Sequence, residues 1–333
     1  MTHMDIFIDK SFESYYRKQP LVLVDVGSSG GIQDRWKRFE KYIHVIGFEP
    51  DQRSYEDLVC NSAANPNAIY INMGLADKKG AQELYLTRTK TDSSLLKPNR
   101  IFLDRFPLSQ RFDIVGTSTI ALDTMDNQLD MHGIKDVDFI KLDTQGTELP
   151  ILQGGKNVIT DLLFGLEVEV EFVPFYENQY LFTDVDQFMR PIGFELFDLF
   201  PVFWRRKIGK GLNNSRGQII FGDAVYLRER ENFRNMISAI KNKDAQKSKV
   251  LRALSVCLAY DFFDYGLEIL DACRDVFSVK EVSFIDDKIR QGGTHKTRVP
   301  SHFPGRQKIA DAFQRLSGHF HQNIPNWAIR RFK

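Results

Sequence analysis

The sequence predicts an α/β protein built on a doubly wound, mostly parallel sheet with an antiparallel last strand, followed by a C-terminal helical extension. Three observations support this prediction. Strand-like and helix-like segments alternate through the first two thirds of the 333-residue chain. The first apolar run, residues 21–26, ends in a cluster of glycine and serine, as is typical of a buried parallel strand. After residue 228 the alternation stops and apolar residues recur at helical spacing.

The elements of the sheet follow one another in a regular order. Short apolar runs predict buried strands, and the amphipathic segments between them predict crossover helices. The predicted strands are 21–26, 44–48, 68–72, 138–143, 164–172, 194–200 and 218–227. The predicted helices are 33–42, 51–62, 148–159 and 184–192. A polar excursion, residues 77–117, interrupts the alternation and contains a short predicted strand at 83–86.

The composition excludes several classes of protein. Hydrophobic residues make up 42% and charged residues 27% of the chain, which is ordinary for a protein that buries a core and excludes disorder. Cys60, Cys257 and Cys273 are widely spaced and form no CxxC pair, so we expect reduced thiols in a cytoplasmic protein. No apolar stretch approaches the ~20 residues that span a bilayer, and residues 1–18 lack the pattern of a signal peptide.

The charge of the chain changes where the pattern changes. Residues 1–227 hold 25 basic and 32 acidic side chains, whereas residues 228–333 hold 20 basic and 12 acidic ones. We therefore predict a first domain at 1–227 and an extension at 228–333, in which residues 250–260 and 261–272 form a helical hairpin.

The end of the chain, residues 288–333, is a candidate contact surface. It carries ten lysines and arginines against one acid, Asp311, interleaved with aromatic residues. Such a segment can contact an anionic lipid surface, such as the inner face of a membrane, or an acidic glycan. A solvated tail is the alternative. Nucleic acid ranks below both because no nucleic-acid motif is present.

The turn after the first strand has the composition of a ligand-binding loop. It spans residues 27–31 and follows Asp25. Open α/β sheets bind ligands beyond the carboxyl ends of their strands, and glycines such as Gly27 and Gly30 let the backbone approach a ligand closely. The dinucleotide pattern GxGxxG does not fit, because its second glycine position holds Ser29. The turn also matches GxSxG, but no histidine follows a late strand, which excludes an α/β-hydrolase.

Acids at the ends of the next two strands complete a nucleoside site with this turn. Glu49, with Asp51 beside it, ends the second strand, and its carboxylate can accept hydrogen bonds from both ribose hydroxyls. Asp77 follows the third strand, where a carboxylate can accept a hydrogen bond from an adenine amino group. An ordinary turn aspartate is the alternative for Asp77.

These motifs, in this order and spacing, resemble the FkbM family of SAM-dependent methyltransferases. The matching segments are 25–27, 47–51, 92–95, 138–148, 167–172 and 174–176. They lie within residues 20–200, and nothing in the resemblance covers residues 228–333. Many relatives have Ala-Asn after the first glycine and Val-Glu-Gly after the acid of the fourth strand. At these places this chain has Ser28 and Ser29, and Thr144, Gln145 and Gly146.

The resemblance implies a class I methyltransferase sheet and methyl transfer from S-adenosylmethionine. The acceptor it implies is a hydroxyl-bearing glycan or small molecule, such as a sugar or a natural product. The cofactor-binding residues expected at the matching positions are Asp25, Gly27, Ser28, Ser29, Gly30, Glu49, Asp51 and Asp77. A catalytically idle scaffold that acts through its C-terminal extension is the alternative function.

A hydroxyl acceptor must lose its proton, which calls for a base or a metal beside the methyl donor. Strand alternation places Lys141 and Asp143 on one face of the fourth strand. It likewise places Glu167, Glu169 and Glu171 on one face of the fifth. We predict that Asp143, Lys141, Glu169 and Glu171 form the catalytic group around the acceptor.

Two alternatives concern the same residues. Glutamates on a buried strand face need partners, so Lys141 could instead pair with Glu167 while Asp143 caps the following helix. The acids could also hold Mg²⁺, but two or three acids are a weak metal signature and we assign no metal ligand.

Part of the polar excursion is a candidate substrate contact. Asp92, Ser93 and Ser94 lie in it, and the excursion can fold over the site at the ends of the strands. A plain surface loop is the alternative for these residues.

Overall fold

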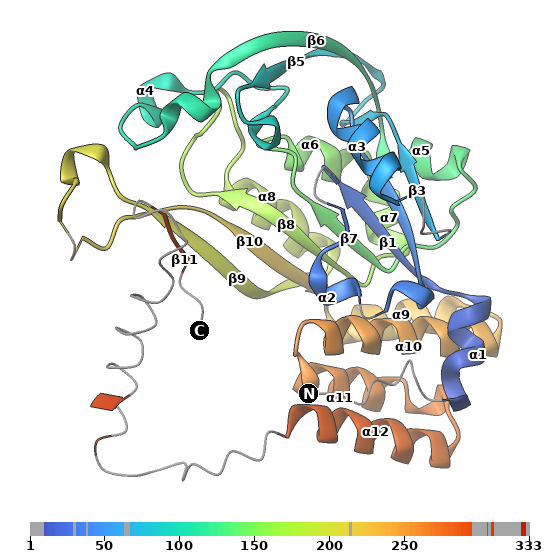
Figure 1. Ribbon diagram of the computed structural model, residues 1–333. Coiled ribbons are helices and arrows are strands. Elements are labelled where there is room, and N and C mark those ends of the chain that lie inside the picture. The colour runs from blue at the N-terminus through green and yellow to red at the C-terminus, as the bar shows by residue number, and fades with distance from the viewer. Residues whose placement is uncertain are drawn as a thin grey trace.

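The computed structural model describes residues 10–28, 31–37, 39–62, 67–212, 215–294, 305, 308–309 and 328–330. Its main sheet has the strand order β11-β9-β10-β8-β7-β1-β2-β3 (Figure 1). The strands are β1 (Leu21–Val26), β2 (Ile43–Phe48), β3 (Ala68–Ile71), β7 (Phe139–Leu142), β8 (Gly165–Glu171), β9 (Phe194–Trp204), β10 (Gln218–Arg228) and β11 (Ala328–Arg330). β10 is antiparallel to its neighbours β8 and β9, whereas β3, β2, β1, β7 and β8 are parallel. The predicted doubly wound sheet with an antiparallel last strand is confirmed.

The strand order reverses beside β1. From β1 the chain adds β2 and β3 on one side of the sheet, and it later returns to add β7 and β8 on the other side. The connections that leave the carboxyl ends of β1 and β7 therefore diverge. Open α/β sheets bind their ligands in the crevice that this divergence creates.

Helices cover both faces of the sheet (Figure 1). The α-helices are α1 (Lys10–Lys18), α2 (Asp34–Lys37), α3 (Gln52–Ser62), α4 (Arg100–Leu103), α5 (Met125–Met131), α6 (Glu148–Gly154), α7 (Lys156–Asp161), α8 (Phe182–Met189), α9 (Arg230–Ala239), α10 (Lys243–Ala259), α11 (Phe263–Ala272) and α12 (Val279–Gly293). Leu21 and Leu23 of β1 belong to a core shared with α10 and α11, while Val22 and Val24 belong to a core shared with α6 and α8. Both faces of β1 are buried, which explains its uninterrupted apolar sequence.

Short 3-10 helices account for some differences from the predicted helices. They are η2 (Glu40–Tyr42), η3 (Lys90–Asp92), η4 (Ser109–Phe112), η5 (Arg190–Ile192), η6 (Lys207–Gly209) and η7 (Arg274–Val276). The helix predicted at 33–42 is formed in part by α2 and in part by η2. The helix predicted at 148–159 is divided into α6 and α7 at Gly155, which caps the end of one and the start of the other.

The helices after residue 228 are part of the layer that covers one face of the sheet. The predicted hairpin is formed by α10 and α11, and α9 and α12 pack beside it (Figure 1). Lys249 and Arg252 of α10 each form a 2.8 Å ion pair with the buried Asp138, which directly precedes β7. The proposed boundary after residue 227 therefore falls within a single hydrophobic core.

The polar excursion forms a second sheet, larger than the predicted strand at 83–86. β5 (Gly80–Thr87) pairs antiparallel with β6 (Ile114–Asp123), and β4 (Gly74–Leu75) pairs parallel with β6. Most of β6 is exposed, so its sequence lacks the apolar alternation that marks a half-buried strand. Figure 1 shows β5 and β6 arching above the end at which β1 terminates. In the part of the chain that the structure describes, no helix is long and apolar enough to cross a membrane.

Candidate functional site

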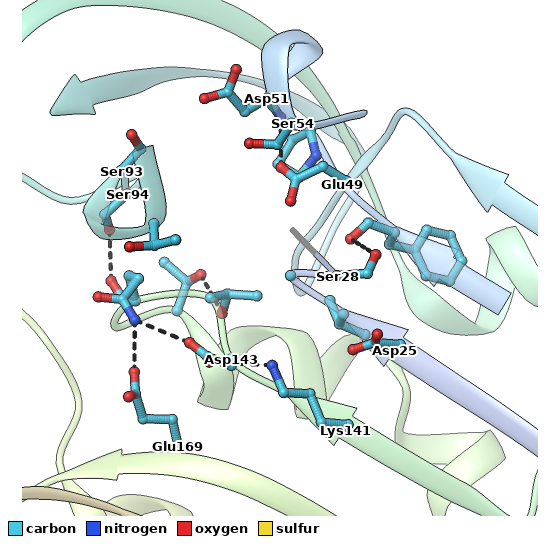
Figure 2. Close-up of a pocket in the computed structure, with 18 of the residues that line it drawn as sticks. Asp25, Ser28, Glu49, Asp51, Ser54, Ser93, Ser94, Lys141, Asp143 and Glu169 are labelled. Atoms are coloured by element: carbon cyan, nitrogen blue, oxygen red, sulfur yellow. Dashed lines mark hydrogen bonds and ion pairs between the residues drawn. The ribbon is translucent and has the colours of Figure 1, made fainter. Parts of the chain in front are cut away.

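A cavity of about 720 Å³ opens at the carboxyl ends of β1, β2, β7 and β8, where the strand order reverses. The predicted site residues that line it are Asp25, Gly27, Ser28, Glu49, Asp51, Lys141, Asp143 and Glu169. Figure 2 shows their side chains arranged around this space. Ser29 and Gly30 lie outside the described residues. Asp77 is exposed and Glu171 is buried, and neither lines the cavity.

The glycine turn passes directly against the end of β7. Gly27 has a φ of +77°, and a Cβ at this position would lie 1.8 Å from the carbonyl oxygen of Asp143. The Gly27 amide donates to the carbonyl oxygen of Phe48 at 3.0 Å, and the Ser28 hydroxyl donates to the same oxygen at 3.3 Å. Only glycine satisfies both the left-handed backbone and this close approach. The turn thus joins the ends of β1, β2 and β7.

Asp25, the first acid of the site, is buried and has one unsatisfied carboxyl oxygen. Its Oδ1 atom has no hydrogen-bond partner within the described residues. Burial raises the pKa of Asp25 to about 6, with the Lys141 ammonium opposing the rise and the Asp143 carboxylate adding to it. An unsatisfied buried oxygen on a cavity wall is suited to accept a hydrogen bond from a bound cation.

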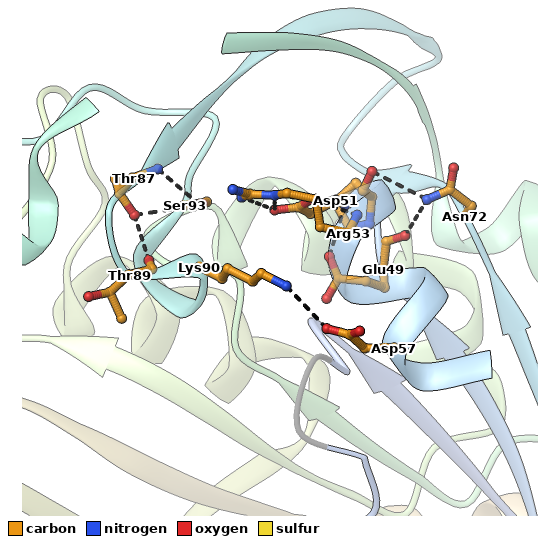
Figure 3. A network of polar contacts seen from close by, with 10 residues as sticks. Glu49, Asp51, Arg53, Asp57, Asn72, Thr87, Thr89, Lys90 and Ser93 are labelled. Carbon is orange, nitrogen blue, oxygen red and sulfur yellow. Dashed lines mark hydrogen bonds and ion pairs between the residues drawn. The ribbon is translucent and has the colours of Figure 1, made fainter. Parts of the chain in front are cut away.

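Glu49 lies across the cavity from Asp25, at the end of β2 (Figure 2). Its residue is 6% exposed, and its Oε1 atom accepts a hydrogen bond from the backbone amide of Asp51 at 2.9 Å. Asn72 fixes the same strand end, because its side-chain amide donates to the carbonyl oxygen of Glu49 at 2.9 Å (Figure 3). Burial raises the pKa of Glu49 to about 7, an effect that the Asp51 amide opposes and the Asp51 and Asp25 carboxylates increase.

Asp51 lines the cavity but already has partners for its carboxylate. It forms an ion pair with Arg53 and accepts a hydrogen bond from the Arg53 amide at 3.0 Å, at the start of α3 (Figure 3). Next to it, Met73 and Gly74 line the cavity where the sequence suggested Asp77. The structure thus brings Asp51, and not Asp77, beside Glu49.

The second half of the cavity is built around Asp143. Lys141 Nζ donates to Asp143 Oδ2 at 3.2 Å, and Gln145 Nε2 donates to Asp143 Oδ1 at 3.0 Å. The same Gln145 nitrogen donates to Glu169 Oε2 at 2.8 Å. One amide therefore bridges the two carboxyl groups, as the dashed lines in Figure 2 show.

The pKa values of the two bridged carboxyl groups are shifted in opposite directions. Burial opposes ionisation of Asp143, but the charge of Lys141 and the hydrogen bond from Gln145 hold the pKa of Asp143 below its usual value. Burial, and next to it the negative charge of Asp143, raises the pKa of Glu169 well above its usual value. For Lys141, burial is outweighed by the charges of Asp143 and Asp25, which raise its pKa. These shifts favour the ionised form of Asp143 and the protonated form of Glu169 beside the cationic Lys141.

Gln145 is a site residue that the sequence did not single out for a role. Its φ is +60°, a left-handed conformation that points its amide between the two acids. Its carbonyl oxygen accepts a hydrogen bond from Ser94 at 2.7 Å, and its Oε1 atom accepts one from the Tyr176 hydroxyl at 3.1 Å. A signal was available, since Gln145 stands where many relatives of the resembled family have a glutamate.

The alternative structural roles for Lys141 and Asp143 are wrong. Lys141 pairs with Asp143, whereas Glu167 accepts from Gln33 at 2.6 Å and lies 3.5 Å from Arg35. Asp143 does not cap the following helix, α6, because Thr147 is its N-cap residue and the amides of Thr144 and Gly146 before it donate to the Glu148 side chain, at 2.8 and 3.0 Å. The carboxylate of Asp143 is therefore left facing the cavity.

The excursion covers the cavity, as the sequence suggested. Asp92, Ser93 and Ser94 all line it. Asp92 is held by an ion pair with Arg111, and the Ser94 hydroxyl reaches Gln145 across the cavity wall. Lys90 of the same segment forms a 3.1 Å ion pair with Asp57 of α3, which links the cover to the cofactor side of the site (Figure 3).

No group of three or more His, Cys, Asp or Glu residues with metal-binding geometry exists within the described parts of the chain. The acids of the cavity are instead engaged by cations and amides of the protein, such as Lys141, Gln145 and Arg111.

Comparison with known proteins places the sequence in a family. A model of the FkbM methyltransferase domain matches residues 25–196, which is more than half of the chain. No curated protein matches it.

Solved structures that resemble the chain include precorrin-6y C5,15-methyltransferase from Geobacter metallireducens, at 10% identity and a TM-score of 0.34, covering 66% of this chain and 86% of that one. An rRNA methylase from Streptococcus thermophilus has 8% identity and a TM-score of 0.31, covering 67% and 98%. A TehB-like SAM-dependent methyltransferase from Corynebacterium glutamicum has 13% identity and a TM-score of 0.28, covering 65% and 87%. These likenesses are too distant to support any conclusion about an acceptor. The family match spans the strands and turns that build the cavity, and the chain belongs to the FkbM methyltransferase family.

Proposed function

We propose that the protein is a SAM-dependent O-methyltransferase that acts on a hydroxyl group of a glycan or natural product. The observation that carries the proposal is the composition of one cavity. It joins a glycine turn and Glu49 at one end to an ionised Asp143 at the other. A cofactor site next to a fixed carboxylate is what transfer to a hydroxyl requires.

The residues of the first half fit S-adenosylmethionine. The unpartnered Oδ1 of Asp25 suits the cofactor's ammonium group, and the missing Cβ of Gly27 lets the turn pack against the carbonyl oxygen of Asp143, which brings this half of the cavity next to that acid. Glu49 would accept hydrogen bonds from the ribose hydroxyls when it is ionised. When bound, this cofactor supplies a methyl group on a sulfonium, so the protein's remaining task is to position an acceptor and take up its proton.

Asp143 is the residue we propose as the base. Each of its oxygens accepts one hydrogen bond, from Gln145 or Lys141, and each retains a lone pair for an acceptor hydroxyl. Lys141 holds the carboxylate ionised and so keeps it able to accept a proton. The raised pKa of Glu169 favours its protonated form, which can donate a hydrogen bond to another oxygen of the acceptor.

The charge of the cavity supports an uncharged acceptor. Its lining contains nine acidic and five basic residues, and acids remain in excess when Glu169 is protonated. This excess of negative charge repels a polyanion, which disfavours nucleic acid as the acceptor and is compatible with a neutral polyhydroxyl compound.

Mass spectrometry of glycans and small metabolites from cells with and without the gene tests the proposal. We expect one compound to lose a methyl group, with a mass difference of one CH₂, in cells without the gene. Restoring the gene should restore the methyl group, whereas a copy carrying Asp143→Asn should not. If the missing methyl group is on a nitrogen or a carbon atom, the O-methyl assignment is overturned.

A further inference from the structure

Two segments at one end of the molecule expose aliphatic side chains to solvent. Ile101 of α4 is 83% exposed, and Ile208 of η6 is 92% exposed. Leu108 and Leu212, in the same two segments, are also exposed. Solitary exposed aliphatic residues are common on protein surfaces, but four of them on two adjoining segments form a pattern that calls for a partner.

The two segments adjoin in space. The Lys207 amide donates to the carbonyl oxygen of Arg105 at 2.9 Å, and this bond ties η6 to the end of α4. Figure 1 shows α4 and the loop after β9 at the same end of the molecule. We call residues 97–112, 201–212 and 215–218 together the basic tip.

The basic tip is strongly positive. It contains nine lysines and arginines and a single acid, Asp104. Asp104 is neutralised by Arg100, which lies 2.6 Å away. Arg206, Lys207 and Lys210 are all exposed around Ile208. Arg111 and Arg100 also pair with Asp92 and Asp113, which lie outside the tip, so the excess positive charge of the tip lies mainly around Ile208.

The exposure of these isoleucines is not the result of a poorly packed region. Phe102, Phe106 and Trp204 of the same segments are buried, and the rings of Phe106 and Trp204 lie 5.5 Å apart in a T-shaped contact. The aromatic residues therefore form a packed cluster, and Ile101 and Ile208 project from its surface into solvent.

We propose that the basic tip binds an anionic lipid bilayer. Aliphatic side chains enter the boundary between headgroups and acyl chains, while lysine and arginine contact lipid phosphates, which is the pattern of Ile208 and its neighbours. Single-stranded nucleic acid fits less well, because bases stack on exposed aromatic rings, whereas Phe102, Phe106, Phe112 and Trp204 of the tip are buried and Phe203 is half-buried. β11 of the C-terminal segment pairs with Val202–Trp204 of the tip. Residues 288–333 carry the same charge as the tip, so charge complementarity does not favour them as a cover for Ile101 and Ile208.

The position of the tip has a consequence that rests on the proposed function. Arg111, Phe112 and Trp204 belong to the tip and also line the cavity. Arg111 pairs with Asp92, and the Tyr176 hydroxyl lies within hydrogen-bond distance of both the Asp92 carbonyl oxygen and Gln145, the neighbour of Asp143. A bilayer bound at the tip would adjoin the acceptor half of the cavity. An acceptor hydroxyl on a lipid-linked glycan would then reach Asp143 directly from the membrane surface.

Vesicle flotation of the full-length protein tests the proposal without acceptor or cofactor, so its result does not depend on the methyltransferase assignment. We expect binding to vesicles of equal parts phosphatidylcholine and phosphatidylglycerol, and little binding to phosphatidylcholine alone. Ile101→Ser with Ile208→Ser, and separately Lys207→Glu with Lys210→Glu, should each lower partitioning by about tenfold or more. Residues 288–333 are unchanged in both variants, so their own affinity for the vesicles cancels in the comparison.

The control is Val279→Ser, because Val279 is 88% exposed but lies on α12, outside the tip. This variant should bind vesicles like the parent protein, and thermal unfolding should show that all variants are folded. Equal vesicle binding by the parent and both tip variants would overturn the proposal. An absence of vesicle binding by the parent protein would also overturn the proposal. In that case, loss of binding to a poly(U) RNA probe in the tip variants would indicate RNA as the occupant. Conversion of a dimer to a monomer in analytical ultracentrifugation would indicate a second copy of the chain.

Discussion

The carboxyl group of Glu49 is buried and has a pKa raised to about 7, so its charge changes within the neutral range. Only the ionised carboxylate can accept hydrogen bonds from two ribose hydroxyls. We therefore expect affinity for S-adenosylhomocysteine to increase as the pH rises through about 7 and to fall below it, where Glu49 is protonated. Isothermal titration between about pH 6 and about pH 8 measures this dependence.

Two variants sharpen this test. Glu49→Gln should bind S-adenosylhomocysteine about tenfold more weakly and lose much of the pH dependence. Glu56→Gln changes an exposed glutamate of α3 that does not line the cavity, and it should behave like the parent protein. Equal affinities for all three proteins at every pH would refute the role of Glu49.

Asp143 should matter for transfer and not for cofactor binding. Asp143→Asn keeps the shape of the side chain but removes its ability to take a proton, so kcat should fall by about 100-fold or more. Affinity for S-adenosylhomocysteine should stay nearly unchanged, since the acid faces the acceptor half. Single-turnover measurements with the acceptor found by mass spectrometry provide the rate. A variant that retains the parent rate would remove Asp143 from the reaction.

Lys141 should set the pH range of activity. Its ammonium group lowers the pKa of Asp143, so Lys141→Met should raise that pKa. The base must be deprotonated, and the acidic limb of the kcat/KM profile should therefore move to higher pH. A profile that keeps its position while the rate falls uniformly would assign Lys141 a purely structural role.

The sequence predicted which faces of β7 and β8 carry the acids, but it did not predict the hydrogen-bonded bridge between Asp143 and Glu169. Strand alternation placed Asp143 and Glu169 on the side where the cavity lies, because a period of two follows from the geometry of any strand. The bridge through Gln145 depends on its left-handed backbone and on the approach of Tyr176 from a distant loop. Neither feature leaves a periodic signal in the sequence.

Among the elements, α10 is joined to the start of β7 by buried ion pairs. Asp138 is buried, and although burial opposes its ionisation, Arg252 and Lys249 hold its pKa below the usual value. Removing one partner of a buried ionic network leaves uncompensated charge. Asp138→Asn should therefore destabilise the protein by about 3–5 kcal/mol in urea unfolding. Asp136→Asn, which removes a more exposed partner of the same cations, should cost less.

The same network predicts how the stability of the fold changes on acidification. A carboxyl group with a lowered pKa stabilises the fold at pH values above its unfolded-state pKa, and this contribution disappears as the pH falls through its folded-state pKa. The parent protein should lose more stability on acidification than Asp138→Asn does. An equal loss in both proteins would contradict the assignment.

Elements with a continuous apolar signal were the ones that the sequence predicted well. The parallel strands of the main sheet lie where expected because both of their faces are buried. The second sheet was largely missed, since most of β6 is exposed and has no apolar alternation. The division of one predicted helix at Gly155 depends on packing against Met125, a contact between distant segments.

At the scale of the whole molecule, the strand order determines where chemistry can occur. The reversal beside β1 brings the glycine turn, Glu49 and Asp143 to one cavity, although they are far apart in the sequence. The C-terminal helices complete the core below the sheet, and the basic tip lies beside the cavity's acceptor half. Pattern alone predicted where the strands lie along the chain, but their order in the sheet and the surfaces that meet at the cavity depend on long-range packing.

The most direct test is the binding of S-adenosylhomocysteine to the purified, full-length protein. The account requires the turn at Gly27 and the acid at Glu49 to form a working cofactor site. Calorimetry should therefore detect saturable binding with one ligand per chain, weakened in Glu49→Gln. A properly folded protein that gives no binding signal at any pH across the neutral range would contradict the central claim.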